Sequence, residues 1–311
     1  MALKTSHSKE PNQDTHRPKR QPFSGISFMS LLGALPYFAF VAAFLIVPII
    51  ANLVTAFEDA TGQPSTETMV EAIGPTYRDA FILTLNLSLL TTIVGGFFGL
   101  IVAWALTSRK AGPSWLSNLV NSFSGLAAQS GGVQLAYAFT ALLGAQGLLT
   151  GFIQKLFSRF SEIFSITDFT GVALVYLYFQ IPLMTVLMLP SMSALKQEWF
   201  DAASSLGATK SQYLRDVALP VLWPPIVGSL LLLFANAFAA YATAYALSGG
   251  SLNLIPIIIG FLISGNVLLN PGLAAALVTW MMIIIVVAMG LRLLLTRRRS
   301  VSSCLCVGLG L

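Results

Sequence analysis

The chain has 311 residues, of which 56% are hydrophobic and only 9% are charged. A soluble domain carries about 25% charged residues, so this composition excludes an ordinary water-soluble protein and predicts a polytopic membrane protein. The net charge of +5 does not indicate nucleic-acid binding, because the basic residues flank apolar segments and form no stripe interleaved with aromatic residues.

The predicted elements begin after a basic, polar segment, residues 1–27, which we expect to be a disordered cytosolic tail. A membrane domain of residues 28–297 follows, and residues 298–311 are expected to form a second cytosolic tail. Within the domain, six apolar segments are each long enough to cross about 30 Å of hydrocarbon. We place these spans at residues 30–57, 80–107, 124–147, 169–191, 221–247 and 271–295.

One further apolar stretch, residues 254–269, is interrupted by Pro256, Gly260 and Gly265. We interpret it as a re-entrant or outer-surface segment, because it is close to the lower length limit for a crossing. A seventh span at this place is the alternative interpretation.

The distribution of basic residues predicts the orientation. With both termini in the cytosol, only Arg78, Lys155 and Arg159 of the 17 Lys and Arg residues lie on the outer side. Short cytosolic segments of membrane proteins carry an excess of Lys and Arg, so this arrangement follows the positive-inside rule. It also agrees with an even number of spans.

Small residues and prolines modify the predicted spans. Gly95, Gly99 and Ala103 lie four residues apart in the second span, a spacing that lets two helix backbones approach closely in lipid. Pro48 and Pro182 fall inside spans, and each is expected to distort its helix by removing a backbone hydrogen bond.

A hydrophilic island, residues 197–225, separates the fourth and fifth spans. Apolar residues at i, i+3, i+4 and i+7 predict one face of a first helix, which ends at Gly207 because glycine favours the left-handed C-cap conformation. Thr209 and Gln212 predict a capping box that opens a second short helix. We expect Leu219-Pro220 to end this helix and Pro224-Pro225 to lead into the fifth span. The apolar face of the first helix consists of Trp199, Ala202, Ala203 and Leu206.

Two interpretations of this island follow from its residues. An exposed apolar helix face fits a groove on a partner protein, with small side chains for close approach and Asp201 available to pair with a basic residue. An amphipathic helix can instead lie on the lipid headgroups.

The island resembles the "EAA" loop of permease subunits of binding-protein-dependent ABC importers, in which Glu-Ala-Ala is followed by three residues, Gly, and later a hydrophobic residue with Leu-Pro. The matching residues are Asp201-Ala202-Ala203, Gly207 and Val217-Ala218-Leu219-Pro220, with Asp201 in place of the usual Glu. Thr91-Thr92 and Ile181-Pro182-Leu183-Met184 also fit the permease core. The resemblance covers residues 30–297 and is nearest to the spermidine/putrescine-type permeases.

The resemblance implies an all-α membrane protein with the type I ABC importer permease fold, in the bacterial cytoplasmic (inner) membrane. The implied coupling loop is residues 197–220. Its partners would be an ABC ATPase dimer, a second permease subunit that forms a heterodimer, and an extracytoplasmic solute-binding protein. The residues that would contact the ATPase are Asp201, Ala202, Ala203, Leu206, Gly207 and Ala208.

Several kinds of catalytic and binding motif are absent from the sequence. Thr209-Lys210-Ser211 lacks the glycines of a phosphate-binding loop, so we expect ATP hydrolysis to occur in a separate subunit and this chain not to be an enzyme. We expect no metal site, because Cys304 and Cys306 have no further ligand nearby. No cofactor and no nucleic-acid partner are expected either. Residues 217–291 contain no charged residue, which disfavours the alternative function of an ATP-independent secondary transporter or channel.

A solute pathway still requires polar lining, and a small set of uncharged polar residues in the spans could provide it. Each of these residues could equally make a helix–helix hydrogen bond or lie at the membrane interface. We consider the group of the fifth span the best candidate for the gate, and a polyamine the solute that the resemblance suggests. The candidates are Gln129, Gln134, Tyr137, Gln180, Asn236, Tyr241 and Tyr245.

Overall fold

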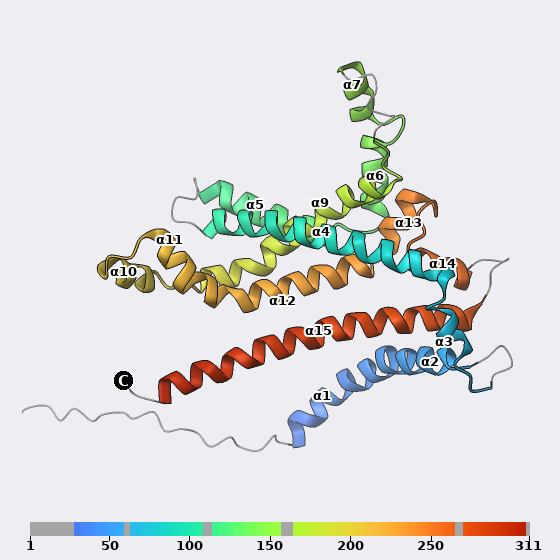
Figure 1. Cartoon of the computed structure of the whole chain (residues 1–311), viewed down its shortest axis with the longest axis horizontal. Coiled ribbons are helices and arrows are strands. Elements are labelled where there is room, and N and C mark those ends of the chain that lie inside the picture. The colour runs from blue at the N-terminus through green and yellow to red at the C-terminus, as the bar shows by residue number, and fades with distance from the viewer. Residues whose placement is uncertain (1–27, 59–62, 108–113, 157–163, 265–269, 309–311) are drawn as a thin grey trace, which may run out of the picture. The chain divides into compact units, whose positions relative to one another are not determined.

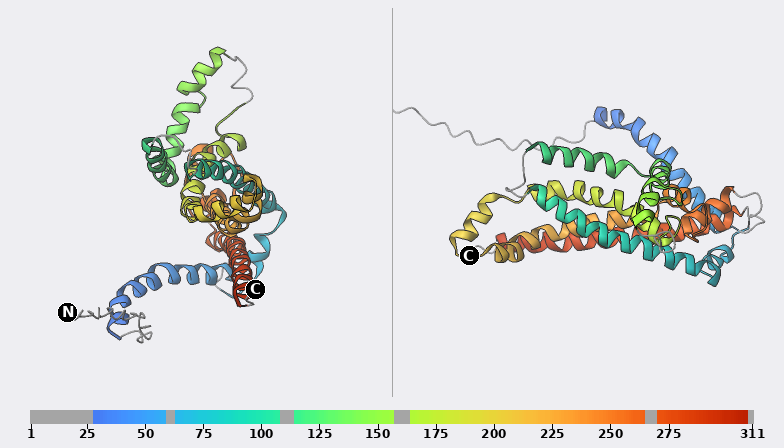
Figure 2. Two further views of the ribbon diagram at one scale, coloured as in Figure 1. Left: turned by 90° about the vertical axis from the view of Figure 1, so that its left-hand side faces the viewer. Right: turned by 90° about the horizontal axis from the view of Figure 1, so that it is seen from above.

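The computed structural model describes residues 28–58, 63–107, 114–156, 164–264 and 270–308. It divides into two compact units, residues 1–51 and 52–311. Helices make up the regular structure of the described residues, apart from one bridge between Glu58 and Pro64 (Figures 1 and 2). The predicted tail of residues 1–27 lies outside the described residues.

The first unit contains a helix that begins at Phe28, in agreement with the predicted first span. It consists of α1 (Phe28–Val41), a π-helical turn η1 (Ala42–Ile46) and the start of α2 (Val47–Ala56). In the π-turn the Val47 N–H donates to the carbonyl of Ala42, five residues back. This turn lies directly before Pro48, which has no N–H to donate, so the distortion expected at this proline takes the form of a widened turn.

The second unit is built around α4 and α9, with α5 and α12 packed on α9 and α15 packed on α12 (Figure 1). Its helices α3 to α9 are α3 (Glu67–Glu71), α4 (Pro75–Thr107), α5 (Ser114–Gln129), α6 (Val133–Leu143), α7 (Leu148–Leu156) and α9 (Phe169–Ser193). The later elements are α10 (Gln197–Ser205), α11 (Lys210–Tyr213), η2 (Leu214–Ala218), α12 (Leu219–Phe238), α13 (Ala242–Ser248), α14 (Ile255–Ser264) and α15 (Pro271–Gly308).

The seam between α4 and α9 is a close helix–helix contact lined by small residues. Gly95, Gly99 and Ala103 are all buried in this part of α4. A Cβ atom on Gly95 would lie 2.9 Å from the Cβ of Gln180, and one on Gly99 would lie 2.5 Å from the Cβ of Met184. Both distances are shorter than side-chain packing allows, so only glycine permits this approach. The close contact predicted from the four-residue spacing is therefore confirmed.

Hydrogen bonds give the direction of the neighbouring helices. Gln180 Nε2 donates to Thr91 Oγ1, and Thr185 Oγ1 donates to the carbonyl of Gly99, so α4 and α9 run parallel. Tyr176 Oη donates to the carbonyl of Ala240 at a distance of 2.8 Å. Further along, Ser229 of α12 bonds to the sulfur of Met188, so α12 runs antiparallel to α9.

Helix α15 is anchored near its start by bonds from distant parts of the chain. Asn52 Nδ2 donates to the carbonyl of Ala275 and to Thr279 Oγ1, and the indole N–H of Trp280 donates to the carbonyl of Met69. α15 then continues as one helix to Gly308, through most of the residues predicted as a tail.

Six segments of the described residues are long and apolar enough to cross a membrane, as predicted. They are Leu35–Ala56, Pro75–Thr107, Val133–Lys155, Phe169–Ser193, Lys210–Phe238 and Pro271–Leu291. The apolar helix α14 has 10 residues and a length of about 15 Å, which is half the thickness of the hydrocarbon layer. Residues 265–269 of the predicted stretch lie outside the described residues. The length of the described helix favours the re-entrant or outer-surface interpretation over a seventh span.

The boundaries of the predicted third span, 124–147, are wrong. These residues form the end of α5, a break at Ser130–Gly132, and α6, which turns away from the bundle together with α7 (Figures 1 and 2). Because α4 and α9 run parallel, the chain must return between them, and α5 is the helix that packs along α9. Hydropathy missed α5 because polar residues are frequent in it, whereas α6 is more apolar.

The predicted end of the second island helix and the predicted boundaries of the fifth span, 221–247, are also wrong. The helix that begins at Lys210 continues through Leu219-Pro220 and Pro224-Pro225 to Phe238. A π-turn lies directly before Pro220, and in it the Leu219 N–H donates to the carbonyl of Leu214. The widened turn accommodates the proline without ending the helix. The real break comes at Ala239–Tyr241, where the carbonyl of Ala240 accepts the Tyr176 hydroxyl.

Candidate functional site

The hydrophilic island forms a helical hairpin of α10 and α11 at one end of the bundle (Figure 1). α10 ends at a glycine, as predicted: Gly207 has φ +82°, a left-handed conformation that other residues adopt only with strain. The Ala208 N–H donates to the carbonyl of Ala203, and the Gly207 N–H donates to the carbonyl of Ser204, both at 3.0 Å. This pair of bonds is the Schellman motif, which fixes the direction in which the chain leaves the helix.

The second helix of the hairpin opens with the predicted capping box. The Gln212 N–H donates to Thr209 Oγ1, and the Thr209 N–H donates to Gln212 Oε1 at 2.7 Å. Two backbone donors that a helix start leaves unpaired are thereby satisfied. The hairpin is therefore ordered by local bonds that its own sequence encodes.

An aromatic pair closes the hairpin, and the sequence analysis did not find it. The rings of Phe200 and Tyr213 lie 5.2 Å apart at 90°, an edge-to-face arrangement. Phe200 lies about 100° around α10 from Trp199, because an α-helix has 3.6 residues per turn. The contact therefore turns the Phe200 side of α10 towards α11, and Trp199 lies outside this contact.

The predicted apolar face is exposed, and Leu206 is its most exposed member at 89%. Trp199 is 39% exposed, and Ala202 is exposed beside it. Asp201 is exposed as well, where its carboxylate accepts a hydrogen bond from Gln197 Nε2 at 2.8 Å. The six predicted contact residues therefore lie together on the hairpin, with Ala203 and Ala208 half-buried and the other four open to solvent.

The hairpin is joined at both ends to the core of the bundle. α10 follows α9 after a link of three residues, and α11 continues through the π-turn into α12 without a break. Below the hairpin, α9 and α12 share an apolar cluster that includes Met188, Met192, Leu222 and Ile226. A force applied to the hairpin would therefore act on two core helices that are packed against each other.

The structure places the pathway candidate Gln180 inside the seam between α4 and α9. It has no exposed surface, its Nε2 donates to Thr91 Oγ1 at 2.9 Å, and its Oε1 is buried without a partner among the described residues. This placement favours the helix–helix hydrogen bond that the sequence left open over contact with a solute.

The other candidates gather at the opposite end of the bundle from the hairpin. Tyr241 and Tyr245 stack at 5.5 Å beside the break that follows α12, and Asn236 is exposed on the last turn of that helix. Gln129, Gln134 and Tyr137 are exposed around the junction of α5 and α6. These two groups are connected by the Gly132 N–H, which donates to Thr243 Oγ1 at 2.8 Å.

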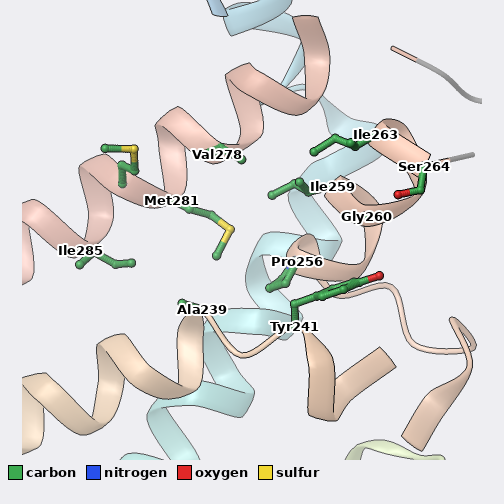
Figure 3. Close-up of a pocket in the computed structure, with 11 residues that line it drawn as sticks. Ala239, Tyr241, Pro256, Ile259, Gly260, Ile263, Ser264, Val278, Met281 and Ile285 are labelled. Carbon is green, nitrogen blue, oxygen red and sulfur yellow. The ribbon is translucent and has the colours of Figure 1, made fainter. Parts of the chain in front are cut away.

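A mainly apolar cavity of about 460 Å³ lies beside Tyr241, between the end of α12, α14 and α15 (Figure 3). Its wall includes Tyr241, Pro256, Gly260 and Met281. Gly260 faces the Tyr241 ring so closely that a Cβ atom there would lie 2.7 Å from it. Among the described residues that line this wall, Ser264 brings the only other side-chain oxygen, so we do not assign a polar solute to the cavity.

Comparison with known proteins gives the class of protein that this chain resembles. No family model matches the chain. The sulfate transport system permease protein CysT of Salmonella typhimurium is 28% identical over 171 residues, which are 55% of this chain and 58% of that protein. The inner membrane ABC transporter permease protein YdcU of Escherichia coli is 26% identical over 235 residues, 67% of this chain and 71% of that protein.

Solved structures show the fold. A chain of a bacterial ABC transporter involved in the import of the acidic polysaccharide alginate matches with a TM-score of 0.67 and 17% identity, over 86% of this chain and 95% of that chain. The alginate transporter has also been solved in complex with an alginate-pentasaccharide-bound periplasmic protein. The chain is thus a multi-pass membrane protein with the fold of ABC importer permeases. Its match to the sulfate permease spans less than two thirds of that protein.

Proposed function

We propose that this chain is a membrane-spanning permease subunit of a binding-protein-dependent ABC importer in the bacterial cytoplasmic membrane. The α10–α11 hairpin lies in the cytosol and docks in a groove of a separate ATPase. The observation that carries this proposal is the exposed Leu206 on a hairpin that is continuous with α12 and joined to α9 by a link of three residues. An exposed apolar helix face joined to two core helices suits transmission of movement.

The partners follow from this role. An ATPase dimer, a second permease and an extracytoplasmic binding protein complete the transporter, and both termini of this chain lie in the cytosol. One similar structure supports this assembly, because the alginate transporter was solved in complex with a solute-bound periplasmic protein. Asp201, Ala202, Ala203, Leu206, Gly207 and Ala208 contact the ATPase.

The solute is a small polar molecule delivered by the binding protein. A polyamine has no support among the relatives reported above, of which one is named for sulfate and another for alginate. An ATP-independent transporter is disfavoured, because the described parts of α5, α9 and α12 contain no charged residue to relay an ion.

The test is to place a charge on the exposed face of the hairpin. Leu206→Asp should abolish co-purification of the co-expressed ATPase and ATP-driven uptake, because an unpaired carboxylate would be buried in the groove. Ser204→Asp is the matched control: it introduces the same charge near the same helix end, but about 160° around α10 from Leu206. If both variants assemble and transport like the parent protein, the docking role is wrong.

A further inference from the structure

Helix α5 differs from the other long helices of the bundle in its content of polar residues. Amide and hydroxyl side chains occur along its whole length, but no charged residue is present. Nevertheless it packs along α9, within the apolar bundle. Just beyond its end, the Gly132 N–H donates to Thr243 Oγ1, so this end of α5 lies at the level of α13.

The exposed surface of α5 divides into two stripes. With about 100° per residue, positions i, i+4, i+7 and i+11 share one face of a helix. The polar stripe consists of the exposed residues Asn118, Ser122, Gly125 and Gln129. The apolar stripe beside it consists of Trp115, Leu119, Phe123 and Leu126, which are 52–69% exposed.

These stripes require different surroundings. The apolar stripe is suited to lipid or to an apolar partner helix. The polar stripe is not, because amides need hydrogen-bond partners that hydrocarbon cannot supply. Asn121, next to the polar stripe, already has a buried Oδ1 without a partner among the described residues. A second unpaired set would be costly, so the polar stripe requires water or another polar partner.

We propose that the polar stripe of α5 lines the aqueous pathway of the transporter and that the pathway carries an oxyanion. This inference rests on the proposed function. The stripe offers amide N–H and hydroxyl donors, and α5, α9 and α12 contain no carboxylate that would repel an anion. Beyond the stripe, Gln134 and Tyr137 continue the polar lining at the α13 end.

Cysteine accessibility in the assembled transporter tests the pathway. With Cys304 and Cys306 replaced by serine, Asn118, Ser122 and Gln129 are changed to cysteine one at a time. The matched controls are Leu119→Cys, Phe123→Cys and Leu126→Cys, which are exposed on the same helix. A membrane-impermeant methanethiosulfonate reagent should modify the stripe cysteines about tenfold faster than the controls, because apolar surroundings suppress the reactive thiolate.

The modification rates decide whether the stripe lines the pathway. Uptake measured in the same vesicles tests the proposed importer function independently. Fast stripe cysteines support the pathway, and equal rates on both stripes overturn it. If ATP-driven uptake persists while the rates are equal, the importer function stands and its pathway lies elsewhere. If the stripe cysteines are fast but uptake does not require ATP, the importer function is wrong and the aqueous lining stands.

The charge of the reagent tests the oxyanion. The rates of a sulfonate and a trimethylammonium reagent at Ser122→Cys are each divided by their rates with a free thiol. A normalised ratio at or above one supports an anion pathway, and a severalfold preference for the cation overturns it. Adding Asn118→Asp should lower the ratio severalfold through charge repulsion, whereas Leu119→Asp should leave it unchanged.

Discussion

The seam between α4 and α9 and the hairpin of α10 and α11 both depend on glycine, but for opposite reasons. In the seam, Gly95 and Gly99 are required because a side chain would collide with α9. In the hairpin, Gly207 has open space around its Cβ position and is required because its φ is +82°. The seam is stabilised by close backbone approach where side chains are absent. The hairpin is stabilised by its backbone conformation and its helix caps.

This difference teaches how a membrane protein can combine a fixed core with a separable contact surface. Helices in lipid gain little from apolar burial alone, so they associate where their backbones can approach closely. The hairpin lies outside that contact and is ordered by its own Schellman motif, capping box and aromatic pair. We therefore expect substitutions in the seam to affect folding and those in the hairpin to affect coupling.

The largest effect is expected from Gly99→Leu. The new side chain would overlap Met184 and the carbonyl of Ile181, and α4 and α9 would have to separate. Overpacking of this kind should lower the free energy of unfolding by about 3 kcal/mol. The measurement is thermal unfolding of the protein in detergent. Gly290→Leu is the control, because no atom of a neighbouring helix lies within 4 Å of its Cβ position. Equal stability of the two variants would contradict the close seam.

A smaller effect, confined to the hairpin, is expected from Gly207→Val. A β-branched residue in the left-handed region costs about 2 kcal/mol, so the end of α10 should open and ATPase co-purification should fall. Thermal unfolding of the bundle should not change. Gly207→Asn should restore most of the coupling, because asparagine tolerates this conformation. Loss of coupling in both variants would show that position 207 must lack a side chain for steric reasons, and that its φ angle is not the cause.

Both glycine-dependent regions could be predicted from sequence because their signals are local. The four-residue spacing of Gly95, Gly99 and Ala103 gave the seam, and the pattern around Gly207 and Thr209 gave the hairpin caps. The Phe200–Tyr213 contact could not be read in this way, because it depends on how two helices fold back on each other. Whether the six residues of the hairpin contact an ATPase stays a prediction.

The errors in the fold have physical causes. α5 was missed because its polar residues lower its hydropathy, and the predicted third span therefore ran across the break between α5 and α6. The continuation of α12 through Pro220 was missed because a π-turn, which composition does not reveal, takes up the missing hydrogen bond. Both errors arise where a helix departs from uniform apolar character or uniform geometry.

A capping variant tests whether the hairpin is ordered independently of the seam. Thr209→Ala removes the acceptor for the Gln212 N–H and should destabilise the start of α11 by about 1 kcal/mol. The measurement is hydrogen exchange of backbone amides, which should become faster in the hairpin and stay unchanged in α4 and α9. Thr209→Ser, which keeps the hydroxyl, is the control. Faster exchange throughout the bundle would contradict the independence of the two regions.

The smallest effect is expected where a polar group lies inside the seam. Gln180→Leu removes the bond from Nε2 to Thr91 Oγ1, but it also removes a buried Oε1 that has no partner among the described residues. Interhelical hydrogen bonds in membranes contribute about 0.6 kcal/mol on average, so a double-mutant cycle of Gln180→Leu with Thr91→Val should give a coupling energy of that size. Uptake should be unchanged, since a side chain with no exposed surface cannot touch a solute. A large loss of uptake at normal stability would instead return Gln180 to the pathway and would mean that the seam opens during transport.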